Sequence, residues 1–228
     1  MKNVKIKEES KNAKETEIVV VLDRSGSMQA IADSTVDGFN TFLFEQQNSE
    51  GDAWITLVQF DDRYEMDYKS IPVKEAKPLI NGETFKPRGY TALFDAIGKT
   101  INELETDRDV VFVIITDGHE NASKEYKKDA VMKMIGDLEK NKGWYFLFLA
   151  ANQDAIKAGG NIGISNNKAF TWKADYEGTT KAFSSFSKNI SNYRSSKMDN
   201  LDLSDVDLFS LKSKLDFTDE QRKDQNES

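Results

Sequence analysis

Short runs of consecutive apolar residues alternate along this chain with stretches in which apolar residues recur every three or four positions. The runs predict buried strands at residues 17–23, 54–60, 109–118, 144–152 and 168–174. The stretches with helical spacing predict helices at residues 31–46, 91–105, 124–140, 153–159 and 176–195. Residues 64–71 alternate between apolar and polar, so they predict a half-exposed strand that pairs back after a tight reversal at residues 61–63.

This order of elements predicts an α/β fold. Strands that are apolar on both faces and alternate with helices form a mostly parallel sheet covered on both sides. In such open sheets, ligands bind at the carboxyl ends of the strands, where the strand order changes direction. Asp23 and Asp117 each lie at the carboxyl end of a predicted strand. We therefore expect a functional site there.

The segment VVVLDRSGSM, residues 19–28, ends an apolar run in polar oxygens. Asp23, Ser25 and Ser27 occupy every second position, and Gly26 permits a tight path that points the three side chains one way. With Thr91 and Asp117 they provide two carboxylates and three hydroxyls, a hard-oxygen set that suits Mg²⁺ or Mn²⁺. The two carboxylates nearly neutralise a divalent ion. The hydroxyls add no further charge, so the metal stays electrophilic and can recruit a further carboxylate.

Taken singly, three of these residues have simpler explanations. Asp23 is typical of a solvated turn that caps the next helix, Thr91 of an N-cap before a helix that begins at Ala92, and Asp117 of a turn before Gly118. Their joint occurrence with Ser25 and Ser27 favours the metal site.

Three motifs carry a family resemblance. DRSGSM resembles the Asp-x-Ser-x-Ser motif of von Willebrand factor A domains, GYTALFDAI resembles their threonine loop, and ITDGHEN resembles their second-aspartate loop. Together these motifs make the family's metal-ion-dependent adhesion site. They occur here in the family's order, and the resemblance spans roughly residues 16–195.

The resemblance implies a Rossmann-like, doubly wound fold. Its mostly parallel central sheet would have about six strands, with helices on both faces and one antiparallel edge strand. Glu17–Asp23 would be the central strand, Asp109–Asp117 would lie beside it, and Tyr64–Ile71 fits the antiparallel edge.

The resemblance also implies the role of each site residue. Ser25 and Ser27 would bind the metal directly, Asp23 and Asp117 would bind it directly or through water, and Thr91 would enter or leave the shell as the site changes affinity. The open coordination position would take a glutamate or aspartate from a partner protein. Four residues are candidates for a rim that contacts this partner: Arg24, Tyr90, His119 and Glu120. His119 and Glu120 are also typical of exposed loop side chains without a binding role. Tyr90 stands where many relatives have glycine.

Composition narrows the function further. The 228 residues carry a net charge of −8, which makes nucleic acid a poor partner. The chain has no cysteine, and His119 is its single histidine, so a zinc site of the usual kind is not expected. No stretch approaches the roughly 20 apolar residues of a membrane helix, and the polar N-terminus does not resemble a secretory signal. We expect a cytoplasmic protein of bacterial or phage origin.

The two ends of the chain differ from the middle. We predict a flexible N-terminal arm at residues 1–15, the domain at residues 16–197, and an acidic C-terminal extension at residues 198–228. The extension predicts a short helix near residues 204–214 and a capping box at TDEQ, residues 218–221. One hypothesis is self-association, in which an acid of this tail ligates the metal of a neighbouring copy. The candidate acids are Asp199, Asp202, Asp205 and Asp207.

The leading interpretation is a metal-dependent protein-binding module, an adaptor or scaffold and not an enzyme. One alternative is a Mg²⁺-dependent hydrolase or phosphotransferase, but phosphotransferases of the haloacid dehalogenase type need a second acid where Ser25 stands, and no phosphate loop occurs. Ser25 as a nucleophile would need His119 as its base. A further alternative is a structural component whose metal only stabilises the fold.

Overall fold

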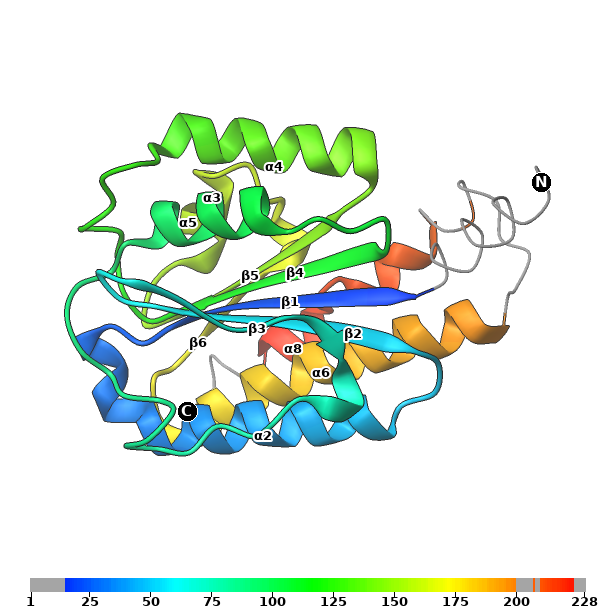
Figure 1. Ribbon diagram of the computed structural model, residues 1–228, viewed down its shortest axis with the longest axis horizontal. Helices are drawn as coiled ribbons and strands as arrows, with labels where there is room; N and C mark the ends of the chain where they lie inside the picture. The colour runs from blue at the N-terminus through cyan, green and yellow to red at the C-terminus, as the bar shows by residue number, and fades with distance from the viewer. Residues whose placement is uncertain (1–14, 200–206, 208–209, 224–228) are drawn as a thin grey trace.

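A single sheet runs through the middle of the protein (Figure 1). The computed structural model describes residues 15–199, 207 and 210–223. Within these residues, six strands pair in the order β3-β2-β1-β4-β5-β6. The strands are β1 (Thr16–Asp23), β2 (Ala53–Phe60), β3 (Tyr64–Pro72), β4 (Asp109–Thr116), β5 (Tyr145–Ala151) and β6 (Ala169–Trp172). All neighbours are parallel except β3, which is antiparallel to β2. The predicted fold class is confirmed.

Helices cover both faces of the sheet (Figure 1). On one face lie α2 (Ala32–Asn48) and α6 (Tyr176–Asp199), and on the other lie α3 (Leu93–Glu103), α4 (Lys128–Lys142) and α5 (Ala155–Gly160). The shorter elements are η1 (Gly26–Ile31), η2 (Val73–Glu75), η3 (Asn166–Lys168), η4 (Lys212–Leu215) and α8 (Asp219–Lys223). None of the helices in the described part of the chain combines the length and the apolar character needed to cross a membrane.

The apolar run of the central strand β1 is continuous because both faces of the strand are buried. Ile18, Val20 and Leu22 pack into the core beneath α2 and α6, whereas Val19 and Val21 pack into the core beneath α3 and α4. Side chains alternate along a strand, so a strand covered on both faces needs apolar residues at every position.

The strand order places the carboxyl end of β1 at the switch point of the sheet. From β1 the chain passes to β2 on one side, and β4 lies on the other. Leu22 pairs with Ile115, which brings Asp23 beside the next residue of β4, Thr116. The crevice expected at this edge is therefore formed by the loops that follow β1 and β4.

The predicted helix at residues 124–140 begins four residues later, at Lys128. The backbone N–H groups of Lys124, Glu125 and Tyr126 donate to the carboxylate of Asp95 at 2.8, 2.9 and 2.7 Å. These groups are held in a loop by a side chain from α3. Apolar spacing within residues 124–140 carries no sign of that contact.

Part of the C-terminal extension packs on the domain. Leu215 and Phe217 are buried, and the Phe217 ring packs against Phe170 of β6 in a tilted arrangement, with 4.8 Å between ring centroids. The Lys212 ammonium lies 2.6 Å from the buried carboxylate of Asp109, at the start of β4. The segment from Lys212 to Phe217 therefore completes the core that α6 covers.

The capping box predicted at TDEQ is confirmed. Thr218 accepts a hydrogen bond from the backbone of Gln221 at 3.2 Å, and Gln221 accepts one from the backbone of Thr218 at 2.9 Å. Of the helix predicted near residues 204–214, residues 204–206, 208 and 209 lie outside the described residues, whereas residues 207 and 210–214 are helical; residues 1–14 of the predicted arm also lie outside. The domain boundaries stay predictions.

We expect Leu215→Ala to lower the free energy of unfolding by about 2–5 kcal/mol, because it empties a fully buried site in the core. Urea denaturation measures this change. Lys214→Ala, at the exposed neighbouring position, is the control and should change stability by less than about 0.5 kcal/mol. Equal, small effects of both substitutions would show that this segment does not belong to the folded core.

Candidate metal centre

Three loops meet at the carboxyl edge of the sheet and carry the predicted site residues. The loop after β1 and the loop before α3 are joined by backbone hydrogen bonds from Gly26 to Gly89 (3.2 Å) and from Arg88 to Arg24 (2.9 Å). The loop after β4 joins them through Asn121. The backbone N–H of Asn121 donates to the Thr91 carbonyl at 3.0 Å, and the side-chain oxygen of Asn121 accepts the Thr91 N–H at 2.9 Å.

Hydrogen bonds link four of the five predicted site residues: Asp23, Ser25, Ser27 and Asp117. Ser27 Oγ donates to Asp117 Oδ1 at 2.6 Å and lies 3.1 Å from Ser25 Oγ. Asp23 accepts the backbone N–H of Ser25 at 2.6 Å and the hydroxyl of Thr116 at 2.5 Å. These hydrogen bonds thus join the loop after β1 to the loop after β4.

The position of Gly118 shows that Thr91 belongs to the same site. An ideal Cβ on Gly118 would lie 2.6 Å from Thr91 Oγ1, 3.5 Å from Asp23 Oδ2 and 3.5 Å from Ser25 Oγ. Oxygens from the loop after β1 and the loop before α3 therefore surround one small space beside Gly118, which a side chain at that position would fill. The structure brings all five predicted residues together: Asp23, Ser25, Ser27, Thr91 and Asp117.

Neither simple capping role applies. The N-cap residue of η1 is Ser25 and that of α3 is Ala92, and neither position has a side-chain capping bond. The oxygens of Asp23 and Thr91 are therefore not used to start helices.

The electrostatics of the site favour a cation. Asp23 is fully buried, and this burial raises its pKa to about 6 against the hydrogen bonds from Thr116 and Ser25. Burial likewise raises the pKa of Asp117, opposed by the hydroxyl of Ser27. Among the described residues, no lysine, arginine or histidine forms an ion pair with either carboxylate. A buried carboxylate beside a half-buried one, with no cationic partner for either, is costly in free energy.

The donor set fits a hard divalent ion rather than a metal that prefers nitrogen or sulphur ligands. In the part of the chain that the structure describes, no three His, Cys, Asp or Glu side chains cluster as a metal site. The oxygens at this edge are instead two carboxylates completed by three hydroxyls, and all-oxygen sets suit Mg²⁺ or Mn²⁺. A metal here would depend on Ser25, Ser27 and Thr91 as much as on the acids.

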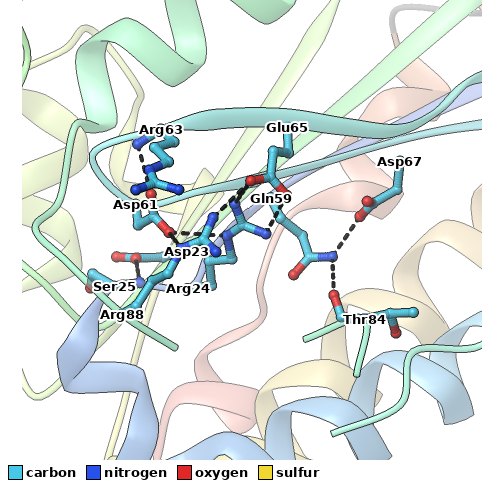
Figure 2. Close-up of polar contacts among 10 residues, drawn as sticks. All are labelled: Asp23, Arg24, Ser25, Gln59, Asp61, Arg63, Glu65, Asp67, Thr84 and Arg88. Atoms are coloured by element: carbon cyan, nitrogen blue, oxygen red, sulfur yellow. Dashed lines mark hydrogen bonds and ion pairs between the residues drawn. The ribbon is translucent and has the colours of Figure 1, made fainter. Parts of the chain in front are cut away.

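Two of the four residues expected on the rim are exposed. Tyr90 is 69% exposed, and His119 also faces solvent. Arg24 is only 4% exposed, so the expectation that it lies on the rim is wrong. Figure 2 shows its guanidinium turned towards Asp61 and Glu65. This ion cluster draws the side chain beneath the surface.

Glu120, the fourth expected rim residue, is turned into its own loop. Its carboxylate accepts the backbone N–H groups of Phe94, Ala122 and Ser123 at 3.0, 3.0 and 2.8 Å, and the Ser123 hydroxyl at 2.6 Å. Glu120 therefore shapes the loop that carries Asp117 and ties it to α3. Both carboxylate oxygens are occupied within the protein.

Sequence reasoning missed several residues that build the site. Thr116 and Gly118 flank Asp117, and Asn121 follows four residues later, but their roles depend on partners from other loops. Asp61 lies in the reversal predicted at residues 61–63, where the sequence indicates only a turn. Its contacts with Arg24 and Arg88 join residues 27 or more positions apart.

Comparison with known proteins supports the fold. The family model of the von Willebrand factor type A domain matches residues 17–190, well over half of the chain. The chain belongs to this family. The match to the von Willebrand factor type A domain contains all three loops of the site.

Solved structures share the fold at low sequence identity. The pilus adhesin SpaC from Lactobacillus rhamnosus GG has a TM-score of 0.60 and 16% identity, over 79% of this chain and 31% of that one. Proximal thread matrix protein 1 from the mussel byssus, with a zinc-occupied MIDAS motif, has a TM-score of 0.56 and 19% identity, over 78% and 46%. This von Willebrand factor type A domain spans less than half the length of both proteins. A search of curated proteins finds no match.

We expect Gly118→Ala to destabilise the protein by about 1–3 kcal/mol, because the new methyl group would meet the Thr91 hydroxyl. Gly136→Ala is the matched control. It lies in α4 with nothing within 4 Å of its ideal Cβ, and replacing a helical glycine there should stabilise the protein by up to about 1 kcal/mol. Thermal unfolding in EDTA measures both changes. The same sign for the two variants would contradict the close packing at Gly118.

Proposed function

We propose that this von Willebrand factor type A domain is a metal-dependent protein-binding module. Such domains often mediate protein–protein interaction. One observation carries the proposal: hydroxyls from two loops surround the same space as the buried Asp23 carboxylate, which has no ion-pair partner among the described residues. A divalent cation would balance that charge.

Five side chains would hold the ion: Asp23, Ser25, Ser27, Thr91 and Asp117. When bound, Mg²⁺ or Mn²⁺ would supply a Lewis-acid position for an oxygen ligand from outside the chain. The protein's part is to hold these oxygens in place. Thr116 fixes Asp23, and Ser27 contacts both Ser25 and Asp117.

The partner we propose is a protein that presents an aspartate or glutamate. Tyr90 and His119 are exposed beside the site and are proposed to contact the residues that flank this acid. Arg24 and Glu120 have their charged groups engaged inside the protein and are not part of the proposed contact surface.

Binding rather than catalysis is our proposal for this site. The Ser25 hydroxyl contacts Ser27, and within the described residues no hydrogen bond joins it to His119. A serine nucleophile needs such a base. The proposed location is the cytoplasm, which a cysteine-free composition suits. A bacterial or phage origin is part of the same proposal.

We expect wild type to bind Mg²⁺ and Mn²⁺ in isothermal titration calorimetry, and Ser27→Ala to weaken binding about tenfold or more, because it removes a ligand and the Asp117 contact. Ser27 is exposed, so the variant should keep its unfolding temperature in EDTA. Ser165→Ala, another exposed serine, sits before β6 at the opposite edge of the sheet and is the control.

The same experiment has a second arm for the partner. A Gly-Gly-Glu-Gly-Gly peptide should strengthen metal binding, whereas its glutamine counterpart should not, because the coupling between two ligands is reciprocal. Metal binding without any preference for the glutamate peptide would favour the structural alternative. Absence of metal binding by folded wild type would overturn the proposed function.

Self-association through the acidic tail also belongs to the proposal. Deleting residues 198–228 would remove the buried Leu215 and Phe217, so single substitutions are the better test. Asp202→Asn with Asp205→Asn should shift a Mg²⁺-dependent oligomer to monomer in analytical ultracentrifugation. A monomeric wild type in Mg²⁺ would count against self-association.

A further inference from the structure

Four charged side chains form a closed cluster beside the candidate metal centre (Figure 2). Asp61 Oδ2 accepts hydrogen bonds from Arg24 Nε at 3.2 Å and from Arg88 Nε at 2.8 Å. Glu65 receives terminal nitrogens of Arg24 at 2.8 and 2.6 Å and of Arg88 at 2.7 Å. Two guanidinium groups thus bridge the same two carboxylates, and the cluster is neutral.

The cluster connects the two loops that supply metal-site hydroxyls to the hairpin of β2 and β3. Arg24 lies between Asp23 and Ser25, and Arg88 lies three residues before Thr91. Asp61 follows β2, and Glu65 belongs to β3. The hairpin contributes no proposed metal ligand, yet it contacts both loops.

Asp61 also reaches the Thr91 loop through its backbone. Its carbonyl accepts the N–H of Ala92 at 2.9 Å, directly after the threonine. Gly89 packs on the same reversal with a φ of +66°, where an added Cβ would meet the Asp62 carboxylate. The segment from Gly89 to Ala92 has no regular secondary structure, so these contacts, with Asn121, define its path.

We propose that Arg88 is a positioning residue that holds the Thr91 loop against the hairpin and so sets the metal affinity of the site. Asp61 and Glu65 receive its guanidinium. The inference rests on the proposed function, because it assigns a role towards the metal. Arg88 is 39% exposed, whereas Asp61 is fully buried, so Arg88 is the residue to change without emptying the core.

Charge and position predict opposite effects of changing Arg88. A guanidinium near a cation site repels the cation, so its removal would strengthen metal binding if charge alone mattered. If Arg88 positions Thr91, its removal weakens binding, as substitutions behind metal ligands typically do by about 10–100-fold. Lysine keeps the charge, but its single ammonium lacks the rigid planar fork with which Arg88 reaches both carboxylates.

The test compares Arg88→Gln and Arg88→Lys with the control Lys86→Gln by calorimetry with MgCl₂ and MnCl₂. Lys86 is exposed in the same loop, so this control removes the same charge from the same segment. We expect both Arg88 variants to bind metal about tenfold or more weakly and the control to bind as wild type or slightly more tightly. Unfolding temperatures in EDTA should stay close to wild type for all three.

A metal-free measurement separates positioning from general damage. In EDTA, the amide protons of Thr91 and Ala92 should exchange faster in Arg88→Lys, whereas amides in the central strand β1 should not change. Metal affinity in Arg88→Lys equal to that of wild type, or tighter binding in both Gln variants, would overturn the inference. Absence of metal binding by wild type would instead overturn the proposed function on which it rests.

Discussion

The carboxylate of Asp23 is buried at the end of β1, held by one hydroxyl and one backbone N–H, with no basic side chain paired to it in the described structure. Burying a carboxylate in this way costs free energy unless a proton or a cation compensates the charge. The groups around it carry partial positive charge but no full charge. Asp117 lies in the same chain of hydrogen bonds. The site therefore attracts a cation, because its own residues do not balance the negative charge of the two carboxylates.

At the next residue, Arg24, the charges are balanced within the protein. Arg24 and Arg88 face Asp61 and Glu65, and this pairing lowers the pKa of Glu65 to about 2, chiefly through its hydrogen bond with Arg24. Successive side chains at a strand end point to opposite sides, so Asp23 and Arg24 enter different environments. The adjacent acid and base do not neutralise each other, and the metal centre remains negative.

Sequence patterns predicted the framework because the framework depends on local regularities. The continuous apolar run of β1 follows from burial on both faces, and four of the five proposed ligands stand at or just after the ends of β1 and β4. What could not be predicted depends on distant partners. The late start of α4 follows from the Asp95 carboxylate, and the burial of Arg24 follows from Asp61 and Glu65. Alternation and spacing within one segment carry no information about such contacts. The same holds for Leu215 and Phe217, whose burial needs the surface of β6 and α6.

The antiparallel direction of β3 links the sheet to the site. A parallel neighbour of β2 would need a crossover and would begin at the opposite edge of the sheet, whereas an antiparallel one turns back at once. The reversal between β2 and β3 therefore lies at the carboxyl edge, next to the loops after β1 and before α3. Asp61 and Glu65 reach those loops only because of this turn. The hairpin of β2 and β3 contributes no proposed ligand, yet it contacts the loop that carries Thr91. These contacts lie at the same edge of the sheet as the site because the chain reverses there.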